Sequence, residues 1–344
     1  MTTPTLRATG LTKLRGGKKV LDNVDLTLRQ GSVTAILGPS GAGKSTLLRA
    51  IAGLEDLNSG TIESDTRVLT DGAALVLPEN RNIGMVFQDF SLFPHLSVID
   101  NVLFGLRSGS VAERRDRALA MLEQVHLSAR AEDYPHMLSG GEQQRIALAR
   151  ALAPAPDTIL LDEAFSGLDG KLRAELRDTA LAAIAAQGAA ALMVTHDAEE
   201  AMYMADTLAL MIDGRIVQTG APAELYLNPV SASAARLLGE INEWDGPVEN
   251  GKLQTPFGAI EAASSVPGRG KALVRPEGMG ISLNPNGNCK AQEIHPLGAN
   301  LAIRVEGPGQ EVWLAKATIE SPIKAGDRVE IKLNPHFCTI VCNA

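Results

Sequence analysis

The sequence is poor in aromatic residues and cysteines, and it has no long apolar run. Only 3% of its 344 residues are aromatic, although 45% are hydrophobic, which suits a globular chain with two or three domain cores. The three cysteines, Cys289, Cys338 and Cys342, lack the paired spacing of a zinc site, so we expect reduced thiols in a cytosolic compartment. The most apolar stretch, residues 180–194, is interrupted by a glutamine and a glycine and is too short to span a bilayer. A role at a membrane would therefore require a partner protein.

The chain also lacks the excess of basic residues that nucleic-acid binding requires. Its formal net charge is −8 at pH 7. Residues 240–344 carry ten lysines and arginines against twelve acidic residues, so this part is also slightly negative. We therefore expect no nucleic-acid partner.

The sequence pattern changes character once along the chain. Up to residue 239, buried-strand patterns such as SVTAILG and AALMVTHD alternate with helical stretches, which predicts an α/β nucleotide-binding domain with a parallel sheet. Beyond residue 240, glycine and proline recur and short runs alternate between apolar and polar residues. We expect domains at 1–239 and 240–344, the second a small all-β barrel or sandwich.

The strongest chemical motif is GPSGAGKST, which lies between a predicted strand and a predicted helix. Its glycines let backbone N–H groups surround phosphates at a helix N-terminus, Lys44 can reach the β- and γ-phosphates, and the hydroxyl of Ser45, which follows the lysine, can hold Mg²⁺. A kinase, a GTPase, a helicase or a transporter motor could each use such a loop. The predicted phosphate-binding residues are Gly38, Pro39, Ser40, Gly41, Ala42, Gly43, Lys44, Ser45 and Thr46.

Two further strand ends carry groups suited to hydrolysis. In TILLDEAF, the apolar strand ends in Asp162, whose carboxylate can bind Mg²⁺, and Glu163 follows, where it could polarise a water molecule. The strand AALMVTHD places His196 at its own carboxyl end, where it could contact the γ-phosphate.

The stretch LSGGEQQR predicts a second anion site at a helix start, formed by Ser139, Gly140 and Gly141. Since the first loop already serves the chain's own nucleotide, one copy carries two half-sites. If two copies dock head to tail with two-fold symmetry, each of these helix starts faces the γ-phosphate on the partner's Lys44 loop. This interpretation predicts a homodimer that encloses two ATP molecules.

Taken together, these motifs resemble those of the ATP-binding subunits of ABC (ATP-binding cassette) transporters, over residues 5–238 and in the family's order. The resemblance implies that Glu163 is the catalytic base and that Ser139 to Glu142 contact the partner's ATP. It also implies that Gln88 senses the γ-phosphate and Mg²⁺, linking the core to a helical subdomain at about residues 89–157. Asp169 in SGLD is expected to communicate across the dimer.

One position departs from the family's pattern. Arg15 stands where the family usually has an aromatic ring that stacks on adenine. A guanidinium plane can also stack on a base, so Arg15 is a candidate adenine contact. The alternative is a solvated charge in a basic hairpin.

The type of transporter that this ATPase drives is also predicted by resemblance. The segment VRPEGMGISL, residues 274–283, resembles the accessory β-domains of bacterial importer ATPases for maltose, sulfate, polyamines and ferric iron. Within this group, the stretches FQDFSLFPHLSV, EEAMYMAD and LLGEINEW are most similar to ferric-iron importers. This implies permease subunits, a periplasmic or surface solute-binding protein reached indirectly, and a peripheral location on the cytoplasmic face of the cell membrane. Polyamine, sulfate or sugar are the alternative cargoes. We expect Arg275 and Glu277 to pair as ordinary surface charges rather than to form a ligand site.

The segment SLFPHLSVIDNVLFGL, which follows Gln88, could connect the ATPase to the membrane subunits. Its apolar residues could form the subdomain core, a groove for a short permease helix, or both; they are Leu92, Phe93, Leu96, Val98 and Val102.

Two rival classes fit less well. A non-transport ABC ATPase should carry a coiled-coil insertion or a second cassette. A module that holds ATP without hydrolysing it should lack Glu163 or His196.

Overall fold

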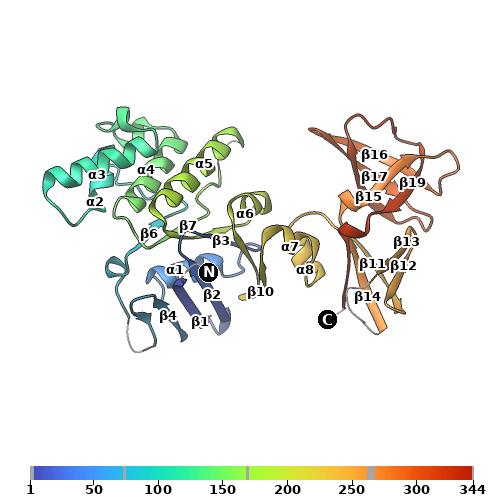
Figure 1. The fold of residues 1–344 in the computed structure, drawn as a ribbon, viewed down its shortest axis with the longest axis horizontal. Helices are drawn as coiled ribbons and strands as arrows, with labels where there is room; N and C mark the ends of the chain where they lie inside the picture. The colour runs from blue at the N-terminus through green and yellow to red at the C-terminus, as the bar shows by residue number, and fades with distance from the viewer. Residues whose placement is uncertain (1–3, 73–74, 168–169, 262–267, 343–344) are drawn as a thin grey trace. The chain divides into compact units, whose positions relative to one another are not determined.

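The computed structural model describes residues 4–72, 75–167, 170–261 and 268–342. The chain forms two compact units, residues 1–222 and 223–344 (Figure 1).

The first unit is built on a six-stranded sheet with the order β10-β9-β3-β8-β7-β6, in which only the edge strand β10 runs antiparallel. β3, β7 and β8 are buried along their whole length, as expected for parallel strands covered on both faces. The strands are β3 (Val33–Leu37), β6 (Ile83–Val86), β7 (Thr158–Asp162), β8 (Ala190–Thr195), β9 (Thr207–Ile212) and β10 (Arg215–Gly220).

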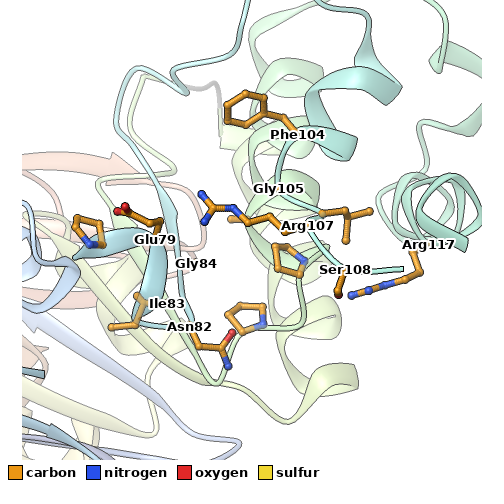
Figure 2. Close-up of a pocket in the computed structure, with 14 residues that line it drawn as sticks. Glu79, Asn82, Ile83, Gly84, Phe104, Gly105, Arg107, Ser108 and Arg117 are labelled. Carbon is orange, nitrogen blue, oxygen red and sulfur yellow. The ribbon is translucent and has the colours of Figure 1, made fainter. Parts of the chain in front are cut away.

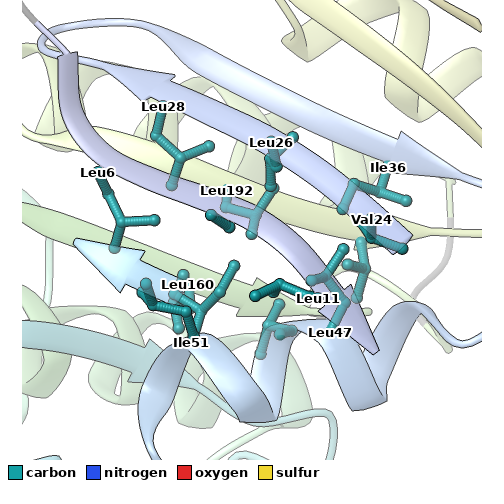
Figure 3. Packing of buried hydrophobic residues seen from close by; sticks show 14 of the residues in the cluster. Leu6, Leu11, Val24, Leu26, Leu28, Ile36, Leu47, Ile51, Leu160 and Leu192 are labelled. Carbon is teal, nitrogen blue, oxygen red and sulfur yellow. The ribbon is translucent and has the colours of Figure 1, made fainter. Parts of the chain in front are cut away.

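An antiparallel sheet with the order β2-β1-β4-β5 packs with helix α1 (Lys44–Ala52) and the parallel sheet. Its strands are β1 (Pro4–Arg15), β2 (Lys18–Arg29), β4 (Ser59–Ser64) and β5 (Val68–Thr70). Leu11 and Val24 of this sheet, Leu47 and Ile51 of α1 and Leu192 of β8 belong to one buried cluster (Figure 3). Burial of these side chains holds the start of α1 in a fixed place.

The remaining helices of this unit include three that form one group. α2, α3 and α4 contact one another, and each begins at a serine whose side chain accepts a backbone N–H. Among the described residues, no helix has both the length and the apolar character needed to cross a membrane. The helices are α2 (Val98–Phe104), α3 (Val111–Gln124), α4 (Gly140–Leu152), α5 (Gly170–Gln187) and α6 (Ala198–Met204).

The second unit contains two five-stranded antiparallel sheets, with orders β13-β12-β11-β14-β20 and β15-β19-β16-β17-β18. Both contribute to one apolar core, so the expected all-β character is confirmed. The strands are β11 (Asn242–Glu249), β12 (Lys252–Thr255), β13 (Gly258–Glu261), β14 (Gly268–Val274), β15 (Met279–Leu283), β16 (Cys289–Leu297), β17 (Asn300–Glu306), β18 (Val312–Thr318), β19 (Arg328–Leu333) and β20 (Cys338–Cys342).

Two short helices, α7 (Pro222–Leu227) and α8 (Ala232–Leu237), also pack with the second unit, so its compact boundary lies earlier than residue 240. Arg275 explains this packing. Its side chain is only 1% exposed, donates to the carbonyl oxygens of Tyr226 at 3.1 Å and Ala235 at 3.0 Å, and stacks on the Tyr226 ring at 4.0 Å. The expectation that Arg275 is a surface charge is wrong, because these carbonyl groups near the ends of two helices attract a buried guanidinium. Glu277 pairs instead with Lys316, at 2.6 Å.

Candidate functional site

The phosphate loop connects β3 to α1 and depends on glycine at two close approaches. Gly43, the residue before α1, has φ = 102°, and a Cβ there would lie 2.4 Å from the carbonyl oxygen of Val20. A Cβ on Gly38 would lie 2.2 Å from the carbonyl oxygen of Met211. Since neither backbone oxygen can move freely, only glycine lets the loop turn tightly into the helix N-terminus.

Lys44 holds this loop from inside. Its side chain is buried, and its Nζ donates to the carbonyl oxygens of Gly38 at 2.8 Å and Pro39 at 3.1 Å. Burial lowers the pKa of Lys44, while the nearby carboxylates of Glu163 and Asp162 oppose that shift. An ammonium group held by two neutral carbonyl groups can exchange them for phosphate oxygens at little cost.

Ser45 and Asp162 bring two oxygen ligands together at the start of α1. The Ser45 hydroxyl donates to Asp162 Oδ1 at 2.9 Å, although the two residues are far apart in sequence. Asp162 is buried at the end of β7, and burial raises its pKa, with the Ser45 hydrogen bond acting against this. A half-buried hydroxyl paired with a buried carboxylate beside a phosphate loop fits Mg²⁺, which prefers oxygen ligands and would neutralise the carboxylate.

Glu163 and His196 come together at the ends of the adjacent strands β7 and β8. His196 Nδ1 lies 3.3 Å from Glu163 Oε2, and both side chains retain some exposure to solvent. Glu163 has φ = 47°, an uncommon backbone conformation for a residue with a side chain. Its N–H donates to the carbonyl oxygen of Val194 at 3.0 Å, and its own carbonyl accepts the Ser166 hydroxyl at 2.8 Å. Strain held by neighbouring hydrogen bonds in this way is typical of functional residues.

The predicted second anion site is the N-terminus of α4. Ser139 and Gly140 are exposed, and a Cβ on Gly140 would meet no atom within 4 Å. A Cβ on Gly141 would lie 2.6 Å from the Leu172 side chain of α5, so this second glycine permits close helix packing. The Ser139 hydroxyl and N–H both donate to Glu142 Oε2, at 2.7 and 2.9 Å, and these bonds lower the pKa of Glu142. A carboxylate thus occupies the two Ser139 donors of the predicted anion site.

Three other predicted residues are less closely tied to this site. Gln88 follows β6 and is exposed. Arg15 ends β1 and pairs with Glu55 at 3.1 Å, so its assignment to adenine remains a prediction. Asp169 lies outside the residues that the structure describes.

Sequence reasoning missed two arginines that fix the surroundings of the site. Arg81 is buried and donates to the carbonyl oxygen of Ile51 at 2.8 Å, near the end of α1. Arg150, near the end of α4, donates to the carbonyl oxygens of Phe90 and Ser91, close to Gln88. Their acceptors are backbone oxygens distant in sequence, for which no local motif exists.

Comparison with known proteins agrees with this geometry. Residues 21–166 match the ABC transporter family model, and residues 272–341 match the TOBE domain model. The Fe(3+) ions import ATP-binding protein FbpC of Pseudomonas fluorescens is 45% identical over 264 residues, which are 76% of this chain and 74% of that protein. The sulfate/thiosulfate import ATP-binding protein CysA of Vibrio cholerae is 37% identical, over 94% of this chain and 90% of its own length.

A third relative, the spermidine/putrescine import ATP-binding protein PotA of Escherichia coli, is 43% identical over 71% of this chain and 64% of that protein. Among solved structures, the dimeric post-hydrolysis ATP-binding cassette MJ0796 bound to ADP and Pi has a TM-score of 0.55 and 33% identity, covering 63% of this chain and 98% of that one. A nucleotide-free ATP-binding cassette from an ABC transporter has a TM-score of 0.57 and 26% identity, covering 64% and 92%. The chain therefore belongs to the ABC transporter family, as an import ATPase subunit with a C-terminal TOBE domain.

Proposed function

We propose that this chain is the ATP-hydrolysing motor of a bacterial ferric-iron importer. Two copies would enclose two ATP molecules, each held by the Lys44 loop of one copy and the Ser139 helix start of the other. The observation that carries the proposal is that these two groups have different partners within one chain. The Lys44 loop is joined to Asp162 and lies beside Glu163, whereas the donors of Ser139 are occupied by Glu142. An exposed helix start with replaceable acceptors suits a phosphate from a second copy.

Glu163 and His196 would carry out hydrolysis at this composite site. The Glu163 carboxylate accepts a proton from the attacking water, and His196, 3.3 Å from that carboxylate, contacts the γ-phosphate. Ser45, Asp162 and Gln88 would hold Mg²⁺, which neutralises charge on the transferred phosphoryl group. Loss of the γ-phosphate removes the contact shared by the two copies, so hydrolysis opens the dimer.

A groove on the first unit would receive a short helix of a membrane permease. It has a volume of about 360 Å³ and lies between the start of β6 and the segment that follows α2. Its wall includes Phe104, which is 63% exposed, and Figure 2 shows Arg107 directed across the groove toward the segment that carries Glu79. Apolar and charged groups on facing walls suit an amphipathic helix. Val98 and Val102 are buried and therefore belong to the subdomain core.

Under this proposal the motor acts on the cytoplasmic face of the cell membrane, where it binds permease subunits and serves a solute-binding protein indirectly. The proposal of ferric iron is supported by the resemblance of FQDFSLFPHLSV and LLGEINEW to ferric-iron importers and by the FbpC relative. The CysA relative, which matches nearly the whole chain, makes sulfate the principal alternative.

The proposal is tested by deleting the gene from its host and measuring uptake of labelled ferric iron, sulfate, polyamine and sugar in parallel. We expect the loss of ferric-iron uptake alone, restored by the parent gene and by Glu199→Gln, an exposed change on α6. Glu163→Gln should fail to restore uptake because the water loses its base, a loss of about 10²-fold or more in hydrolysis. Unchanged ferric-iron uptake in the deletion strain would reject this cargo, and restoration by Glu163→Gln would reject the catalytic assignment.

A further inference from the structure

The backbone just after Gln88 adopts an unfavourable conformation. Phe90 and Ser91 have φ values of 61° and 44°, in the left-handed region that residues with side chains rarely adopt. Such residues persist only where their surroundings hold them in place. The segment therefore needs an external support two residues beyond Gln88.

Arg150 of α4 supplies that support. Its two terminal nitrogens donate to the carbonyl oxygens of Phe90 at 2.9 Å and Ser91 at 2.7 Å. Both residues with positive φ are thus bonded to one planar guanidinium group, whose fork matches two neighbouring acceptors. Burial lowers the pKa of Arg150, but the group stays charged, and nearby Asp89 favours the charge.

The guanidinium of Arg150 is also linked to the proposed permease groove through two aromatic rings. Its central carbon lies 5.6 Å from the centre of the Phe93 ring, and that ring lies 4.4 Å from the ring of Phe104 in the groove wall. Fully buried Asn101 fixes Phe93 by accepting its N–H at 2.9 Å and donating to its carbonyl at 3.1 Å. A continuous set of contacts therefore runs from the groove through Phe93 and Arg150 to the loop of Gln88.

We propose that Arg150 is a positioning residue for Gln88. By holding the loop that follows Gln88 against α4, Arg150 makes the position of the Gln88 amide at the nucleotide depend on the position of α4. This inference rests on the proposed function, because it assigns Gln88 to the γ-phosphate and Mg²⁺. Ser139 caps the other end of α4. The single helix α4 would therefore connect the ATP bound to the second copy with the Gln88 loop, which faces the ATP bound to the chain's own Lys44 loop.

A double-mutant cycle on the purified full-length protein tests this role. Arg150→Met should lower kcat about tenfold with KM for ATP changed less than about twofold, because the Lys44 loop stays intact while Gln88 is misplaced. Gln88→Ala should produce a similar loss. In the Gln88→Ala background, Arg150→Met should lower kcat by less than about twofold, because no amide remains to be positioned.

The controls separate positioning from general stability. Arg150→Lys keeps the charge but loses the fork, so it should recover only part of the activity, and it completes the cycle if Arg150→Met does not fold. Equal loss of kcat from the Arg150 change in both backgrounds would overturn the proposal, since a structural role is additive. If Gln88→Ala alone leaves kcat unchanged, the assignment of Gln88 fails and the positioning role fails with it. The ferric-iron proposal is judged separately by cellular uptake, so the two failures are distinguishable.

Discussion

At the scale of single residues, Asp162 shows how a ligand site can oppose folding. Its carboxyl is buried and hydrogen bonded to Ser45, and burial raises its pKa above the value in the unfolded chain. A folded-state pKa above the unfolded one means that ionisation disfavours the folded state, so stability falls as the pH rises through this range. Above the raised pKa the penalty is present until a cation neutralises the carboxylate.

The upward shift of the Asp162 pKa can be tested by measuring stability as a function of pH. Without nucleotide or Mg²⁺ at pH 7.5, Asp162→Asn should raise Tm by about 2–4 °C, because an amide keeps an acceptor for Ser45 without a buried charge. The gain should shrink as the pH approaches about 4, where the parent carboxyl is protonated. Calorimetry across this pH range measures both effects.

The matched control is Asp116→Asn, which changes an exposed aspartate of α3 and should leave Tm within about 1 °C. Hydrolysis should be lost in Asp162→Asn despite its greater stability, since a neutral amide is a weak Mg²⁺ ligand. A variant less stable than the parent at pH 7.5 would show that the ionised carboxylate supports the fold.

At the scale of elements, the phosphate site was predictable and its supports were not. Lys44, Ser45, Asp162 and Glu163 occur in short contiguous motifs, and parallel strands bring their carboxyl ends to one edge of the sheet. The structure joins these residues as that rule requires. Arg150 lies on a half-buried face of α4, where the sequence gives no sign that its partners are carbonyl oxygens about sixty residues earlier.

Arg275 shows the same difficulty in the second unit. From the sequence, the two helices that Arg275 contacts, α7 and α8, could be assigned to the end of the first domain, because the helical sequence pattern continues to residue 238. The structure ties them to the β-domain through carbonyl groups that only tertiary contacts reveal. A domain boundary drawn from a change in secondary structure therefore falls after these helices, whereas the contacts place it before them.

The role of Arg275 is testable with the protein's own fluorescence. The chain's two tryptophans, Trp244 and Trp313, both lie in the second unit, so their emission reports unfolding of that unit. Arg275→Met should lower the free energy of unfolding of the second unit by about 3 kcal/mol, because buried carbonyl groups lose their charged donor. Urea titration measures this change.

Arg269→Met is the matched control, because Arg269 lies on β14, the strand that Arg275 directly follows, is exposed and should contribute less than about 0.5 kcal/mol. Equal effects of the two substitutions would show that the buried guanidinium does not hold α7 and α8 in place.

At the scale of the whole molecule, the proposed motor depends on two events that one chain cannot complete alone. ATP binds first to the Lys44 loop, and closure follows when Ser139 of a second copy reaches the same γ-phosphate. In the unpaired chain Glu142 accepts both Ser139 donors, so closure exchanges a carboxylate for a phosphate at the same helix N-terminus. Binding and dimerisation should therefore be separable by substitution.

Light scattering of trapped protein tests this separation. With ATP and Mg²⁺, Glu163→Gln should shift from the 36.3 kDa monomer to a dimer of twice that mass, because the shared γ-phosphate is retained. Adding Ser139→Arg to that variant should block closure with a bulky side chain at the helix start, while the affinity for ATP stays within about threefold. If the double variant still dimerised with ATP, Ser139 would not lie at the closing contact. If it instead lost ATP binding as a monomer, the helix start would belong to the chain's own nucleotide site.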